Sequence, residues 1–138
     1  MRKIFTTFFL TAICSFYVMG QSLQTTFEKT QGKETPTYNE IIAWWKKADQ
    51  ASTLLTLQTK GPTDAGFPLH LAILSNKGYH SIHAAKEAGA SIILVNNGIH
   101  PGEPDGIDAS MLLVKNVIEK KLALPQNLVV AIIPVYNI

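Results

Sequence analysis

Apolar and polar positions repeat with two different periods along the chain, and the change of period separates expected helices from expected strands. Residues 38–45 place apolar side chains on one face at helical spacing, directly after a Thr37-x-x-Glu40 pair of the capping-box type. This pattern predicts a helix that begins at Tyr38. Residues 52–60 and 67–74 instead alternate at every second position around a Gly/Pro turn, which predicts a β-hairpin.

The second half of the chain predicts a strand–helix–strand unit. Residues 92–95 and 128–135 are apolar without polar alternation, which is typical of strands buried on both faces. Residues 104–124 between them have a helical pattern, so the two strands are expected to be parallel. Residues 79–89 predict a short helix or an irregular crossover. Together these elements predict an α/β fold with a mixed sheet.

The first twenty residues differ in composition from the rest. Arg2 and Lys3 precede an apolar run, and Val18 and Gly20 are small residues before Gln21. This pattern predicts a cleavable secretory signal peptide over residues 1–20, because the run is shorter than the ~20 apolar residues of a spanning helix. We therefore expect a secreted or periplasmic protein that has no membrane contact after cleavage.

Removal of that segment changes the charge and the redox chemistry. The 138-residue chain has a formal charge of +2, and the loss of Arg2 and Lys3 leaves a near-neutral protein with no basic surface for nucleic acid. Cys14, the single cysteine, is also removed, so no disulfide is expected. Residues 21–36 are polar and aperiodic, which predicts a polar leader or mobile arm before a domain at residues 37–138.

Candidate metal ligands follow the strand at residues 91–97. His100 and Glu103 stand in a His-Pro-Gly-Glu turn, and the acidic start of the next helix follows directly. Ligands bind at the carboxyl ends of strands in such sheets, and a His₂Glu set is one established zinc site. The residues alone leave open a second interpretation, in which His100 and Glu103 cap a loop and face solvent.

A second group of potential ligands lies in residues 79–89. His80 and His83 are three positions apart, and Glu87 follows one helical turn later. On a short polar connection such side chains are usually solvated, so we do not expect a metal there. The chain also lacks a P-loop and a Gly-x-Ser-x-Gly nucleophile elbow.

The segment Asn97-Gly-Ile-His-Pro-Gly-Glu103 resembles the first zinc-ligand motif of the zinc carboxypeptidases, the carboxypeptidase A-like family. The resemblance extends over residues 37–138 through the opening helix, the hairpin at residues 61–69 and the segment Ile133-Pro-Val-Tyr-Asn137. It implies an α/β/α sandwich with a mixed, largely parallel sheet and one zinc ion. It also implies that His100 and Glu103 are the first and second ligands, and that the substrate is a peptide cleaved at its carboxyl end.

The chain departs from the family pattern at three positions. Phe67 replaces an arginine of the hairpin, Gly102 replaces an arginine that contacts substrate in digestive members, and Ile138 replaces a proline. The family's third ligand, its Asn-Arg pair for the substrate carboxylate and its general-base glutamate all come later than residue 138. We therefore expect the chain to be an inactive front part of a longer enzyme. A related zinc deacylase or amidohydrolase, or a non-catalytic binding module of the same fold, remains open.

Overall fold

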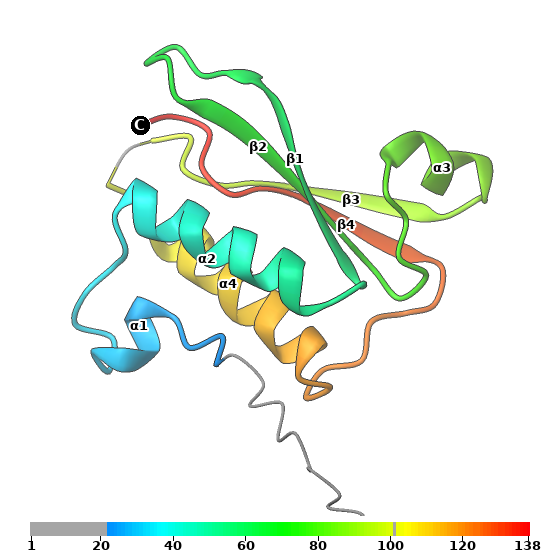
Figure 1. Cartoon of the computed structure of the whole chain (residues 1–138), viewed down its shortest axis with the longest axis horizontal. Helices are drawn as coiled ribbons and strands as arrows, with labels where there is room; N and C mark the ends of the chain where they lie inside the picture. The colour runs from blue at the N-terminus through cyan, green and yellow to red at the C-terminus, as the bar shows by residue number, and fades with distance from the viewer. Residues whose placement is uncertain (1–21, 101) are drawn as a thin grey trace, which may run out of the picture.

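A computed structural model describes residues 22–100 and 102–138 as a mixed four-stranded sheet with helices on both faces (Figure 1). The order of the strands across the sheet is β1-β2-β4-β3. Their bounds are β1 (Leu55–Pro62), β2 (Pro68–Ser75), β3 (Ser91–Asn96) and β4 (Leu128–Ile133). The expected signal peptide, residues 1–20, lies outside the described residues.

The pairing of the strands follows from the connections between them. β1 and β2 form the expected antiparallel hairpin, and β2 also pairs with β4 in an antiparallel sense. β3 and β4 are parallel and are connected through helix α4 (Asp105–Ile118), as the apolar pattern predicted. The predicted α/β class and the mixed character of the sheet are therefore confirmed.

Side-chain alternation along the strands decides which helix covers which face. Val130 and Ile132 of β4 belong to one core cluster with Trp45 of α2 (Tyr38–Ala51) and with residues of α4. Val129, one position away, packs on the opposite face with Ala85 of α3 (Ile82–Glu87). The sheet thus has α2 and α4 side by side on one face and α3 on the other, which is a three-layer α/β/α arrangement (Figure 1).

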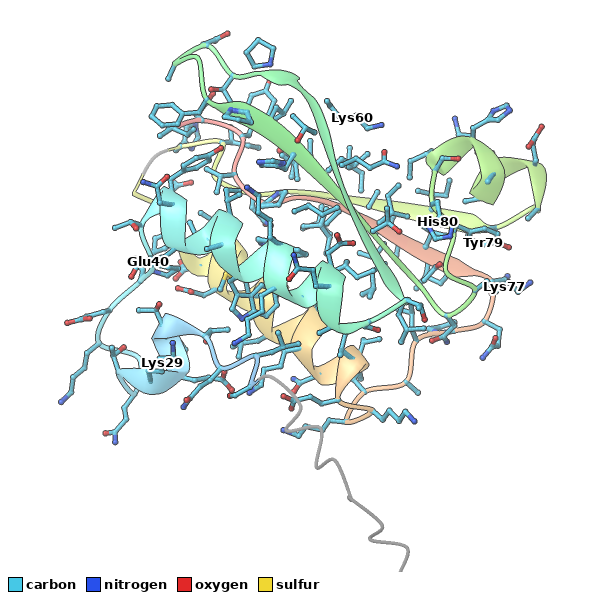
Figure 2. The ribbon with its side chains drawn as sticks, in the orientation of Figure 1. Lys29, Glu40, Lys60, Lys77, Tyr79 and His80 are labelled. Carbon is cyan, nitrogen blue, oxygen red and sulfur yellow. The ribbon has the colours of Figure 1, made fainter. Side chains whose placement is uncertain are left out.

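Both long helices begin where the sequence predicted. Glu40 accepts hydrogen bonds from the backbone N–H of Thr37 at 2.8 Å and from its hydroxyl at 2.7 Å, which completes the start of α2. In Figure 2, Glu40 is labelled at this end of the helix. Pro104 is the N-cap residue of α4, and Asp105 and Asp108 lie in its first turn. Carboxylates there stabilise the helix through its dipole.

The prediction that β3 is buried on both faces is wrong for the described part of the chain. β3 is an edge strand, and only β4 pairs with it. Its Ile93 is 50% exposed and its Leu94, on the opposite face, is 63% exposed. Only Ile92 and Val95 pack against the two core clusters. An apolar run identifies a strand, but the position of that strand in the sheet depends on segments distant in sequence.

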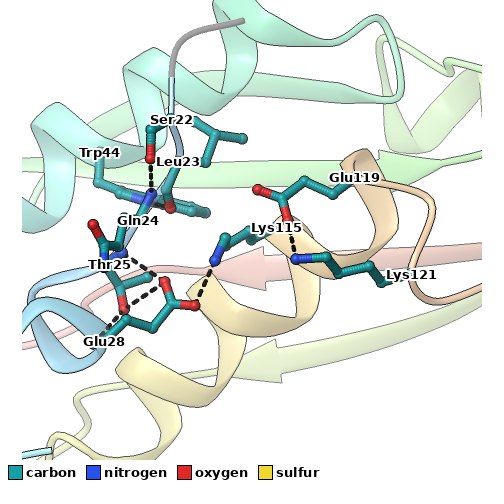
Figure 3. A network of polar contacts seen from close by, with 9 residues as sticks. All are labelled: Ser22, Leu23, Gln24, Thr25, Glu28, Trp44, Lys115, Glu119 and Lys121. Atoms are coloured by element: carbon teal, nitrogen blue, oxygen red, sulfur yellow. Dashed lines mark hydrogen bonds and ion pairs between the residues drawn. The ribbon is translucent and has the colours of Figure 1, made fainter. Parts of the chain in front are cut away.

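Of the segment predicted as a polar leader or mobile arm (residues 21–36), residues 22–29 pack on the helices. We call these residues the N-terminal strap; it ends in helix α1 (Thr26–Lys29). The Leu23 side chain is 3% exposed, and its carbonyl accepts a 2.9 Å hydrogen bond from Trp44 Nε1. Glu28 forms an ion pair with Lys115 of α4 (Figure 3). One apolar anchor and one ion pair therefore fix the strap to α2 and α4.

Within residues 22–100 and 102–138, no helix combines the length and the apolar character needed to cross a lipid bilayer.

Candidate metal centre

The turn with His100 and Glu103 begins where the parallel ladder of β3 and β4 continues beyond both strands. The N–H of Asn97 donates to the carbonyl of Ile133 at 3.2 Å, and the N–H of Tyr136 donates to the carbonyl of Asn97 at 2.9 Å. Gly98 follows with φ of +61°, a conformation that side chains rarely adopt. A Cβ atom at Gly98 would lie 3.1 Å from Val135 Cγ1. The chain therefore leaves the sheet at Gly98 and places the turn at its carboxyl edge.

The two predicted ligands come together in this turn. His100 Nδ1 lies 3.1 Å from Glu103 Oε2, and the side chains are 74% and 70% exposed. The Glu103 N–H donates to the His100 carbonyl at 3.3 Å, so the backbone is folded tightly between them. Two ligands of a tetrahedral zinc ion at ~2.1 Å stand about 3.4 Å apart. The spacing and the donor types of this pair therefore fit two positions on one zinc ion.

The pair supplies two candidate ligands and not a full set. In the part of the chain that the structure describes, no three His, Cys, Asp or Glu side chains converge as a metal site. A catalytic zinc site takes three protein ligands and keeps one position for water or substrate. The described residues can thus supply part of such a site.

A hollow of about 290 Å³ adjoins the turn. His100 and Glu103 lie on its polar side. Its apolar wall comes from α2, α4 and the segment after β4, through Tyr38, Ile41, Ile107, Val135 and Ile138. Its size approaches that of small-molecule sites, which are mostly apolar with a few polar groups. A ligand held by the pair would therefore meet an apolar surface.

Asp108 is a buried acid in the first turn of α4, five residues after Glu103. The residue is 5% exposed, and its Oδ1 has no hydrogen-bond partner among the described residues. Burial, with a smaller contribution from the charge of Asp105, raises the pKa of the Asp108 carboxyl above its usual value. This carboxyl therefore takes up a proton more readily than an exposed one.

The second group of candidate ligands does not assemble. His83 Nε2 lies 3.2 Å from Glu87 Oε1 on α3, with side chains 83% and 68% exposed. His80 precedes that helix, and its Nδ1 lies 3.2 Å from Thr56 Oγ1 of β1. Figure 2 shows His80 beside α3, at the end of the sheet where β3 begins. The structure thus leaves a surface His–Glu pair there, far along β3 from the His100 turn.

His70, the remaining histidine, is a core residue. It is 5% exposed on β2, and its Nδ1 lies 3.2 Å from Thr59 Oγ1 on the neighbouring strand. Burial lowers the pKa of the His70 imidazole, and the positive charge of Lys46 lowers it further. A neutral, hydrogen-bonded ring satisfies the packing at this position.

Two asparagines that sequence reasoning did not assign hold the turn. Asn97 is 5% exposed and donates from Nδ2 to Ser110 Oγ at 2.8 Å. Asn137 donates from Nδ2 to the carbonyl of Ile99 at 2.6 Å. A Cβ atom at Gly106 would lie 2.7 Å from Asn97 Oδ1, so α4 approaches Asn97 closely because a glycine stands there. The sequence offers an Asn-Asn-Gly run after an apolar strand. This run indicates that the strand ends there, but it does not indicate a role for the Asn97 side chain.

A solved carboxypeptidase structure shows the same fold. The carboxypeptidase A from Helicoverpa armigera superposes with a TM-score of 0.61 over 72% of this chain, at 16% sequence identity. This chain has a carboxypeptidase-like fold. It spans 24% of the length of that neighbour. No protein-family model and no characterised protein matches the sequence.

The carboxypeptidase-like fold agrees with the expectation drawn from the order of helix, hairpin and βαβ unit. At 16% identity the likeness concerns the fold alone. The assignment of His100 and Glu103 as zinc ligands stays a prediction, which rests on their own geometry.

Proposed function

We propose that this chain is part of a zinc-dependent hydrolase of the carboxypeptidase type, in which His100 and Glu103 are two of the zinc ligands. The observation that carries the proposal is the 3.1 Å approach of His100 Nδ1 to Glu103 Oε2 at the carboxyl edge of the sheet. The carboxypeptidase-like fold supports it, because ligands of α/β sheets bind at that edge.

The chemistry of the two side chains suits this role. Imidazole nitrogen and carboxylate oxygen are common zinc ligands, and the 74% and 70% exposure of the two side chains leaves both open to an ion from solvent. Glu103 stands directly before Pro104, the N-cap residue of α4. When bound, zinc polarises a carbonyl oxygen and lowers the pKa of coordinated water toward ~7.

In this proposal, the described residues position a substrate and do not by themselves catalyse its cleavage. The apolar wall of the hollow beside Glu103 offers a surface for an apolar side chain. In this proposal, a third ligand and a general base come from groups other than the described residues. The substrate is a peptide, and residues 1–20 direct the protein to the cell envelope or the exterior.

A related deacylase activity is the alternative that an assay must separate. A bidentate arginine is the best partner for the terminal carboxylate of a peptide, and residues 22–138 contain no arginine. In a protein that carries the complete site, N-blocked dipeptides and N-acyl amines distinguish the two activities. Release of the carboxyl-terminal amino acid supports the carboxypeptidase assignment, whereas release of the acyl group alone contradicts it.

The zinc assignment is tested by titration of Zn²⁺ into the purified chain after removal of any affinity tag, because histidine tags bind zinc. The test variant is His100→Ala, and the matched control is His83→Ala. Both histidines face a glutamate, at 3.1 and 3.2 Å, and both are highly exposed. We expect His100→Ala to weaken zinc binding at least tenfold and His83→Ala to leave it unchanged. Equal zinc affinity in the two variants would exclude the assignment.

A further inference from the structure

We propose that Asn137 is a positioning residue for the His100–Glu103 pair, an inference that rests on the proposed zinc site. Asn137 makes two hydrogen bonds to successive carbonyls just before His100. Its backbone N–H donates to Gly98 at 2.9 Å, and its side-chain Nδ2 donates to Ile99 at 2.6 Å. Asn137, which follows β4, thus holds the backbone of the two residues just before His100.

The opposite end of the turn is held by a second amide. The buried Nδ2–Oγ bond from Asn97 to Ser110 joins the end of β3 to the second turn of α4. Since Glu103 lies just before α4, this bond fixes the backbone on the glutamate side. Asn137 acts on the histidine side, so the separation of the two ligands depends on both asparagines.

The two asparagines differ in how much of the surrounding packing depends on their side chains. Asn97 is 5% exposed, so its replacement would disturb the packing between β3 and α4. The Asn137 side-chain bond is exposed to solvent. Surface substitutions of this kind change global stability little. A loss of zinc affinity without a loss of stability is therefore the signature of a positioning role at Asn137.

The backbone between His100 and Glu103 includes a glycine, and this explains why a residue outside the turn can affect the position of His100. Gly102 has φ of +96° with open space around its Cβ position, and it stands between His100 and Glu103. Glycine gives the backbone freedom, and the bond from the Glu103 N–H to the His100 carbonyl does not hold the backbone before His100, which Asn137 bonds from outside the turn. Groups that orient metal ligands from outside change metal affinity by about 10–100-fold when they are removed. We expect the lower value for Asn137, because it acts through a backbone carbonyl.

The test compares three variants of the full chain, again after removal of any affinity tag. Asn137→Leu removes the amide donor at nearly constant shape and adds no charge. Asn137→Gln keeps an amide donor on a longer arm. Asn76→Leu is the matched control, because Asn76 Nδ2 also donates to a backbone carbonyl, that of Leu124, at a site remote from the turn.

Zn²⁺ alone is the probe, with affinity from calorimetry, ring resonances of His100 from NMR, and thermal unfolding without metal. We expect Asn137→Leu to lower zinc affinity about tenfold while the unfolding midpoint stays near that of the parent. Asn137→Gln recovers most of the affinity, and Asn76→Leu retains all of it. In Asn137→Leu, the zinc-dependent shift of the His100 resonances becomes smaller at equal zinc.

The possible failures can be told apart. If His100→Ala loses zinc while Asn137→Leu binds as tightly as the parent, the positioning role is overturned and the zinc site stands. If His100→Ala binds zinc as well as the parent, the zinc site itself is overturned. A parallel fall of affinity and unfolding midpoint in Asn137→Leu, without recovery in Asn137→Gln, identifies a purely structural residue and overturns the inference.

Discussion

The N-terminal strap provides a quantitative test of the fold, through the substitution Leu23→Ala. The Leu23 side chain is 3% exposed and belongs to the main core cluster, so the change removes a buried side chain. Leu→Ala substitutions in cores cost ~2–5 kcal/mol. Leu23 lies near the end of the described chain, where neighbours can relax, so we expect about 2–3 kcal/mol. The bond from Trp44 goes to the Leu23 carbonyl and remains available in the variant.

Urea unfolding, followed by tryptophan fluorescence, measures this loss, because Trp44 bonds to the strap. The expected loss corresponds to roughly 10 °C in the thermal midpoint for a domain of this size. Gln24→Ala is the control, since Gln24 is the next residue and is exposed; it should change stability by less than about 0.5 kcal/mol. Equal stability of the two variants would show that the strap does not pack on the helices.

Two further predictions concern charge and the sheet edge. Burial raises the pKa of Glu28, but its bonds with Lys115 and Thr25 outweigh the effect of burial and leave the pKa below its usual value. The paired carboxylate therefore stabilises the fold at neutral pH, and this contribution is lost as pH falls through the lowered pKa. Glu28→Gln should therefore cost about 1 kcal/mol at pH 7, and the difference from the parent should vanish in urea titrations at acidic pH. Leu94→Lys should change stability by no more than about 0.5 kcal/mol, because Leu94 is 63% exposed on an edge strand. The same substitution should reduce aggregation measured by light scattering. A loss of stability above about 2 kcal/mol would contradict the exposure of Leu94.

The sheet shows which part of a fold local patterns can predict. The hairpin, the crossover helix and the parallel pair followed from periodicity, because each depends on contacts between neighbouring segments. The exposure of Ile93 and Leu94 did not follow, because the same four apolar residues suit a central strand and an edge strand alike. Strand order is decided by which segments are present to pair, and no local pattern contains that information.

The N-terminal strap was missed for a different reason. It has one fully buried apolar side chain, Leu23, so it has no period to detect. Its capping box, Thr25-x-x-Glu28, has the same spacing as Thr37-x-x-Glu40, which was recognised. A capping box without an apolar helix after it is weak evidence, and the short α1 is stabilised mainly by its tertiary contacts.

The proximity of the two candidate ligands followed from the sequence, whereas the residues that hold their turn did not. His100 and Glu103 belong to one turn, so spacing and turn chemistry bring them together. The side-chain bonds of Asn97 and Asn137 reach 13 and 38 residues along the chain, and no spacing rule connects such distant positions. Asn137 can make its bond to Ile99 only after β4 has paired with β3.

The hydrogen bonds of Tyr136 and Asn137 to Asn97 and Gly98 also have a consequence for biosynthesis. The ribosome completes both candidate ligands more than thirty residues before it adds the partners that hold their turn. A nascent chain that has reached the end of α4 therefore carries His100 and Glu103 on a turn that still lacks the Tyr136 and Asn137 bonds. Under the proposed zinc site, we expect metal binding to begin only when β4 has docked beside β3.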